Sequence, residues 1–149
     1  MSSKADDRIS RVRLFLSIAH LFGQRSTCPR AQVGAIAVWR GRIIASGYVG
    51  AVSGQPHCAE SGCDMQDGHC VRTVHAEANV VAWAARAGVS LNGATLYCTH
   101  GPCLNCAKLL INAGIVTVVY REKPKPSWGE GLKLLESSLV EVRHEENPR

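Results

Sequence analysis

Strand-forming and helix-forming segments alternate along almost the whole chain, and this order restricts the fold more than any other feature. Residues 6–23 open with acidic side chains, repeat apolar side chains every three or four positions and end at Gly23, which predicts an amphipathic helix. Two β-branched runs around an Arg-Gly-Arg connection, at residues 33–49, predict a hairpin. The later segments predict helices at 75–88, 102–114 and 129–138 and strands at 93–100, 115–121 and 139–145.

Strands that are joined through helices run parallel, because such crossovers are right-handed. The sequence therefore predicts a three-layer α/β/α fold around a mixed five-stranded sheet. A chain of 149 residues has the size of one ordinary domain and buries a core without disulfides, so we expect a single domain over residues 1–149.

Composition limits the classes of protein that remain. No leader pattern and no membrane-length apolar run is visible, so we expect a soluble, cytoplasmic protein without a membrane partner. In a reducing compartment, seven cysteines with clustered histidines indicate metal ligands rather than disulfides. Lys and Arg outnumber Asp and Glu by 17 to 12, which suits an anionic substrate or a nucleic acid without deciding between them.

The predicted helix at 102–114 opens with two candidate metal ligands. Cys103 and Cys106 are three residues apart and share a helix face, and Pro102 suits the first helical position because that position needs no amide hydrogen. Free amides and the positive end of the helix dipole favour thiolates, the form that binds zinc.

The preceding helix opens with His75 and Glu77, which are two residues apart. They do not face the same side of a regular helix, so both approach one metal only if it lies beyond the helix tip. If the two helix starts point to the same place, His75, Cys103 and Cys106 bind a zinc ion whose fourth position is open, as in catalytic sites. Glu77 would then serve as general acid and base for a water molecule in that position.

His-x-Glu followed about 25 residues later by Pro-Cys-x-x-Cys, with a strand before the second helix, is the signature of zinc deaminases. The alternative is a purely structural zinc site, which an adjacent carboxylate and an open fourth position disfavour.

Nearly the whole chain resembles the deoxycytidylate (dCMP) deaminase family of the cytidine deaminase superfamily. The matching stretches fall in the family's order: "STCPRAQVGAIAV", "GRIIASGYVGAVSGQPHC", "HCVRTVHAEANVV" and "GATLYCTHGPCLNCAKLLINAGIVTVVY". The resemblance implies a cytidine deaminase-like fold and hydrolysis of dCMP to dUMP and ammonia in pyrimidine nucleotide metabolism. It also implies zinc on His75, Cys103 and Cys106, Glu77 as proton shuttle, a homohexamer, and regulation by dCTP and dTTP with Mg²⁺.

The chain departs from the family at Val49, because the family usually has a nucleotide-contacting Asn directly after Gly-Tyr. Loss of a buried polar contact changes specificity by orders of magnitude. By the same resemblance, Tyr48 and Asn79 are expected to face the nucleotide. The alternative for Asn79 is a helix-surface or capping amide.

Four of the remaining cysteines are candidates for a second, structural zinc site. Some family members carry one, and the resemblance matches two of its ligands; Cys28, Cys58, Cys63 and Cys70 form the preferred set, with His69 as a substitute ligand. Residues 49–74 form a long, polar, Gly-rich loop that such a zinc would order. Reduced thiols or an oxidation product are the alternative. The seventh cysteine, Cys98, lies within a predicted strand and reads as a small buried hydrophobe.

Arginines at predicted strand ends or loops are candidates for phosphate binding, since guanidinium groups bind phosphate in a bidentate manner. Arg30 is favoured because it precedes the first strand in a segment that matches the family. The others are Arg25, Arg40, Arg42 and Arg121.

Two further functions fit parts of the sequence. A deaminase of the same fold could act on a base in nucleic acid or on a modified cytosine nucleotide. Nucleic-acid editing needs a groove with basic and aromatic side chains, and aromatic residues make up only 5% of the chain. A non-catalytic zinc module that binds a partner is the remaining alternative.

Overall fold

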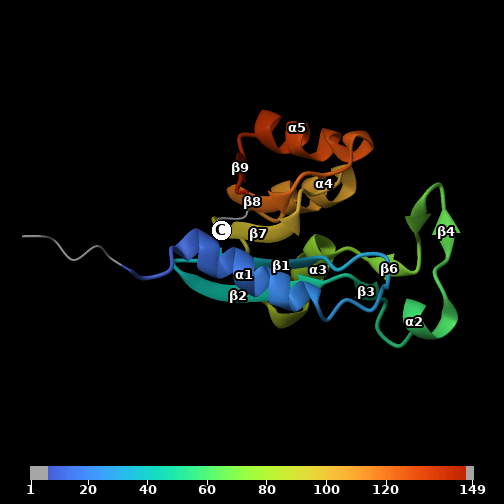
Figure 1. Cartoon of the computed structure of the whole chain (residues 1–149). Helices are drawn as coiled ribbons and strands as arrows, with labels where there is room; N and C mark the ends of the chain where they lie inside the picture. The colour runs from blue at the N-terminus through green and yellow to red at the C-terminus, as the bar shows by residue number, and fades with distance from the viewer. Residues whose placement is uncertain (1–6, 147–149) are drawn as a thin grey trace, which may run out of the picture.

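The computed structural model describes residues 7–146, so the ends of the expected domain, 1–6 and 147–149, lie outside the described residues. A five-stranded sheet in the order β2-β1-β7-β8-β9 forms its centre (Figure 1). β1 runs antiparallel to both β2 and β7, whereas β8 runs parallel to both β7 and β9. This confirms the predicted mixed sheet. Its strands are β1 (Gly34–Trp39), β2 (Arg42–Tyr48), β7 (Thr95–His100), β8 (Thr117–Glu122) and β9 (Glu141–His144).

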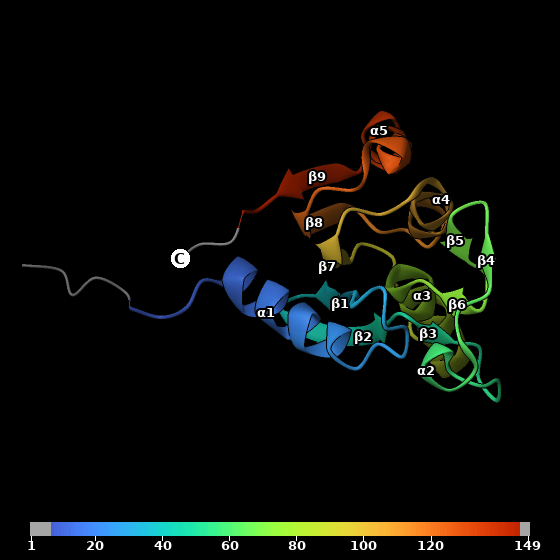
Figure 2. The same cartoon turned by 45° about the vertical axis from the view of Figure 1, so that its right-hand side comes forward.

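Helices cover both faces of this sheet, which makes the three layers (Figures 1 and 2). Alternate residues of β1 separate the two cores. Ile36 packs with the first helix, whereas Ala35 and Ala37 pack in the core that includes the other three helices. This alternation follows from the two-residue period of a strand. The helices that cover the sheet are α1 (Arg11–Gly23), α3 (Ala76–Ala87), α4 (Leu104–Asn112) and α5 (Glu130–Ser137).

The first helix is shorter than predicted, because α1 begins at Arg11 rather than at residue 6. Ser10 is the N-cap, and its hydroxyl accepts the amide hydrogen of Arg13 at 3.2 Å. A serine cap satisfies one of the amides that lack a helical partner, so the helix starts at this point. Ile9, which precedes this cap, is 51% exposed.

The segment between β2 and α3 has more structure than the irregular loop that the sequence predicted. It extends to one side of the sheet (Figure 1). Its turn at Asp67 and Gly68 has positive φ at both residues, as two-residue hairpin turns require. An Asp-Gly pair is a hairpin signal, and it was missed in the sequence. The segment contains β3 (Gly50–Ala51), α2 (Cys58–Ser61), β4 (Met65–Gln66), β5 (His69–Cys70) and β6 (Thr73–Val74).

No helix in residues 7–146 is both long enough and apolar enough to cross a membrane. A short 3-10 helix, η1 (Pro126–Trp128), lies in the connection between β8 and α5. This connection reaches the site described next.

Candidate active site

The N-termini of α3 and α4 bring three predicted zinc ligands together. His75 is the N-cap of α3, Cys103 is the N-cap of α4, and Cys106 lies in the first turn of α4. The Nδ1 atom of His75 is 3.5 Å from the Sγ atom of each cysteine. A tetrahedral zinc with Zn–N of about 2.0 Å and Zn–S of about 2.3 Å places nitrogen and sulfur about 3.5 Å apart. The three donors therefore fit one zinc ion and leave a fourth position open.

Pro102 does not occupy the first helical position, contrary to the prediction. Helix α4 begins at Leu104, and Cys103 keeps an extended backbone with φ −73° and ψ 171°. The carbonyl of Cys103 accepts the first helical hydrogen bond, from the amide of Ala107 at 2.9 Å. Cys103 therefore lies at the N-terminus of the helix, on the side toward which the free amides point.

The electrostatics of this cluster favour metal binding. Hydrogen bonds from the thiol of Cys106 and from His75 lower the pKa of Cys103 to about 3, despite partial burial. The hydrogen bond between the two cysteines raises the pKa of Cys106, because its thiol donates to the Cys103 thiolate. The hydrogen bond to Cys103 also raises the pKa of His75. Thiolate character is thus present before a metal adds its own charge.

Glu77 lies in the first turn of α3 and is 4% exposed. Burial raises the pKa of its carboxyl above the usual range, against opposing contributions from a backbone amide and His75. A buried carboxyl with a raised pKa exchanges protons closer to neutral pH, as a general acid and base must. The sequence predicted this residue and its place beside the metal ligands.

The cluster opens into a cavity of about 310 Å³, which is within the range for small-molecule sites. Glu77, His75 and Cys103 lie on its wall, together with Val49, which is 4% exposed. An apolar side chain thus lines the cavity where the family usually has an amide. Of the five candidate arginines, Arg30 alone is among the described residues that line it.

Four further residues line this cavity that the sequence interpretation missed. His100 comes directly before the Gly-Pro-Cys turn, and its ring hydrogen bonds to Thr99 at 2.9 Å. Lys123, Lys125 and Trp128 come from the connection between β8 and α5. The only sequence signal for these last three residues was "KPKPSW", the single Pro-rich connector in the sequence.

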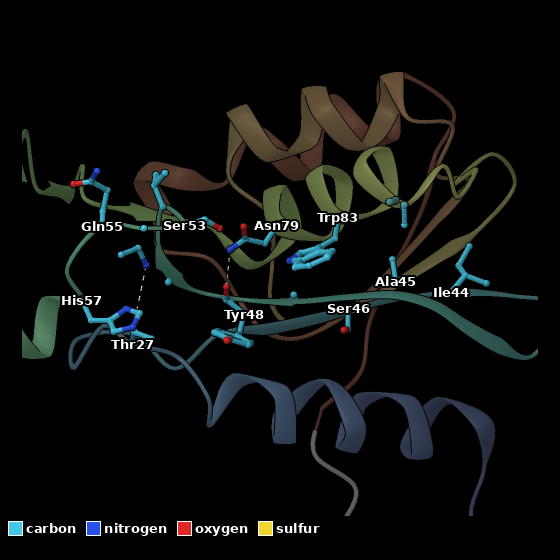
Figure 3. Close-up of a pocket in the computed structure, with 17 residues that line it drawn as sticks. Thr27, Ile44, Ala45, Ser46, Tyr48, Ser53, Gln55, His57, Asn79 and Trp83 are labelled. Atoms are coloured by element: carbon cyan, nitrogen blue, oxygen red, sulfur yellow. Dashed lines mark hydrogen bonds between the residues drawn. The ribbon is translucent and has the colours of Figure 1, made fainter.

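Tyr48 and Asn79 do not join Glu77 in this cavity. Both line a separate cavity of about 770 Å³ between the end of β2 and α3 (Figure 3). The side-chain amide of Asn79 donates to the carbonyl of Tyr48 at 2.8 Å and to that of Val74 at 3.5 Å. Asn79 therefore ties the end of β2 to the helix that carries Glu77.

The second set of cysteines also comes together. The Sγ atoms of Cys58 and Cys70 are 3.7 Å apart, and those of Cys28 and Cys63 are 4.0 Å apart. Two thiolates on one tetrahedral zinc lie about 3.8 Å apart, so each of these spacings is compatible with a shared metal. The Sγ atoms of Cys28, Cys58 and Cys63 all lie within 4.8 Å of one another, and Cys70 lies beside Cys58. The substitute ligand, His69, instead stacks on Trp128 with ring centroids 4.9 Å apart.

Burial raises the pKa of Cys58 to about 12. Burial acts in the same direction on Cys70, but backbone hydrogen bonds at Arg72 and Asp64 outweigh it and lower its pKa to about 7. Cys98 is fully buried in β7, as predicted, and belongs to neither cluster.

The fold and the site define an α/β protein with an open metal site and a buried carboxylate beside it. The family model of the cytidine and deoxycytidylate deaminase zinc-binding region matches residues 9–122. The chain belongs to the cytidine and deoxycytidylate deaminase family, whose zinc-binding region this is.

The chain is also similar to individual proteins. ComE operon protein 2 of Bacillus subtilis is 49% identical, over 80% of this chain and 63% of that protein's length. Deoxycytidylate deaminase of Enterobacteria phage T4 is 35% identical, over 85% of this chain and 86% of the phage protein. The crystal structure of dCMP deaminase from cyanophage S-TIM5 in complex with dCMP and dUMP has a TM-score of 0.79 and 36% identity, covering 89% of this chain and 94% of that one.

Proposed function

We propose that this protein is a zinc-dependent hydrolase that converts dCMP and water to dUMP and ammonia. The observation that carries the proposal is the buried Glu77 beside the His75, Cys103 and Cys106 donors, in a cavity that is also lined by Arg30, Lys123 and Lys125. The S-TIM5 dCMP deaminase, solved with dCMP and dUMP, supports the choice of substrate.

A zinc ion bound by His75, Cys103 and Cys106 would supply Lewis-acid chemistry at this site. The carboxylate of Glu77 accepts a proton from the attacking water and delivers it to N3 of the pyrimidine. It then moves the second proton of that water to the amino group at C4, which leaves as ammonia. Its raised pKa suits a group that must both accept and donate.

Substrate binding is assigned to Arg30, which lines the cavity, with the phosphate as its ligand. Its guanidinium contacts Met65 of β4, so the segment between β2 and α3 lies against Arg30. Tyr48 and Asn79 are assigned an indirect part: their contact supports the strand end that precedes Val49. Val49 lines the cavity with an apolar side chain in place of the family's amide.

A second zinc ion, structural rather than catalytic, is proposed for Cys28, Cys58, Cys63 and Cys70. The sulfur spacings of 3.7 and 4.0 Å support it. The homohexamer, regulation by dCTP and dTTP with Mg²⁺, and the cytoplasmic location stay predictions from the family resemblance and the sequence.

The test is to incubate the zinc-loaded protein with dCMP, dCTP, deoxycytidine, CMP and a cytosine-containing oligonucleotide, and to measure ammonia and the deaminated product. The proposal predicts the highest kcat/KM for dCMP. Activity on the oligonucleotide alone would replace it with nucleic-acid editing. Absence of activity on every substrate, with zinc bound, would favour a non-catalytic module.

A further inference from the structure

The connection between β8 and α5, residues 123–129, is packed against the loop that carries Cys103. The amide of Gly101 donates to the carbonyl of Glu122 at 2.9 Å. A Cβ atom at Gly101 would lie 2.7 Å from Cδ of Pro124, so only glycine permits this approach. The start of the connection is therefore fixed relative to the catalytic ligands.

The far end of the connection is fixed in the same way. The amide of Trp128 donates to the carbonyl of Lys125 at 2.7 Å, which closes the 3-10 turn. Three residues beyond η1, a Cβ atom at Gly131 would lie 2.6 Å from the carbonyl carbon of Cys103. Trp128 thus lies between two positions at which the chain closely approaches residues 101–103.

The indole ring of Trp128 faces the catalytic imidazole. Its centroid lies 6.2 Å from that of His75, with 21° between the planes. Two stacked flat rings lie about 3.5 Å apart, so two rings that hold a third ring between them lie about 7 Å apart. A movement of about 1 Å by this half-buried side chain would admit a pyrimidine. His69 of β5 stacks on Trp128, with 18° between the ring planes, and supports the indole.

Positive charge lies next to this ring. The Nζ atom of Lys125 is 5.5 Å from the centroid of Trp128, and Lys123 and Arg30 line the same cavity. Among the described residues that line it, Glu77 is the one carboxylate, and it is buried beside the metal ligands. A ligand that combines a flat base with an anionic group fits this arrangement.

We propose that the connection between β8 and α5 determines specificity for a nucleoside monophosphate: Trp128 packs on the pyrimidine opposite His75, and Lys123 and Lys125 bind the 5′-phosphate. The inference rests on the proposed function and assigns its substrate contacts. Arginine is not required for every phosphate contact, because a lysine ammonium binds phosphate as a point charge.

Tryptophan fluorescence tests the base contact directly. The chain has three tryptophans, and Trp39 and Trp83 are exposed outside this cavity. A Trp39→Phe/Trp83→Phe protein reports on Trp128 alone, and a Trp39→Phe/Trp128→Phe protein is the matched control. With zinc bound, the product dUMP should quench the first protein saturably and leave the second unchanged. Unchanged Trp128 fluorescence, while calorimetry detects dUMP binding, would overturn the assignment.

Kinetics test the phosphate contact. Lys123→Gln and Lys125→Gln should each raise KM for dCMP about 10-fold, the loss of one charged contact, and should leave kcat/KM for deoxycytidine unchanged. Lys108→Gln, an exposed lysine on α4 outside the cavity, is the control. Equal effects on both substrates, or no effect on dCMP, would overturn the assignment. A wild-type protein without deaminase activity would instead refute the proposed function.

Discussion

Gly131 gives a substitution whose effect follows from the geometry around Cys103. Glycine at this buried position allows α5 to approach the active-site loop, because an added Cβ atom would lie 2.6 Å from the carbonyl carbon of Cys103 and even closer to the carbonyl oxygen of Pro102. Both are backbone atoms, so no side chain can rotate away. Gly131→Ala should therefore lower the free energy of unfolding by about 1–3 kcal/mol, the usual cost of overpacking.

Gly129→Ala is the matched control, two residues earlier. Gly129 has φ −63° and ψ −14°, and the nearest atom to an added Cβ is the carbonyl oxygen of Pro126 at 3.5 Å. Alanine fits this conformation and restricts the unfolded chain, so it should be neutral or add up to about 1 kcal/mol. Urea unfolding of both zinc-loaded variants measures the difference. Equal stabilities of the two variants would refute the close-packing argument.

Three other outcomes are expected. Zinc analysis should find about two ions per wild-type chain; Cys58→Ala should lose one and Cys98→Ala should keep both, whereas one ion in the loaded wild type would contradict the second site. Burial lowers the pKa of His100 below 6.5, so protonation favours the unfolded state and stability should fall as the pH drops below about 6.5. His100→Gln should weaken that pH dependence in urea unfolding, and an unaltered dependence would refute it. Asn79→Ala removes the hydrogen bond to the Tyr48 carbonyl and should cost about 1–3 kcal/mol in the same assay; a loss below 0.5 kcal/mol, on the order of error, would contradict its supporting role.

The sequence was sufficient for features that depend on local patterns. Periodicity predicted the strands and helices of the mixed sheet, and the spacing of His75, Glu77, Cys103 and Cys106 predicted their convergence at two helix starts. Local capping limited the accuracy of boundaries. The hydroxyl of Ser10 sets the start of α1, five residues after the predicted start.

Features that depend on packing between distant segments could not be predicted in this way. Trp128 reaches the cavity because Gly101 and Gly131 let the chain approach the Cys103 loop, and no local pattern reports such an approach. Tyr48 and Asn79 were expected at the nucleotide. They line a second cavity, where β2 packs closely on α3 and a Cβ atom at Gly47 would lie 2.5 Å from the carbonyl oxygen of Ala76.

The most direct test of the account compares Glu77→Gln with wild type in the conversion of dCMP to dUMP, with ammonia and bound zinc measured on the same samples. Glu136→Gln, an exposed carboxylate on α5, is the control. Wild type and control should release equimolar dUMP and ammonia. Glu77→Gln should retain its zinc and lose about 10²-fold or more in kcat, the usual contribution of a general acid and base. Wild-type turnover by a zinc-loaded Glu77→Gln protein would contradict the central claim.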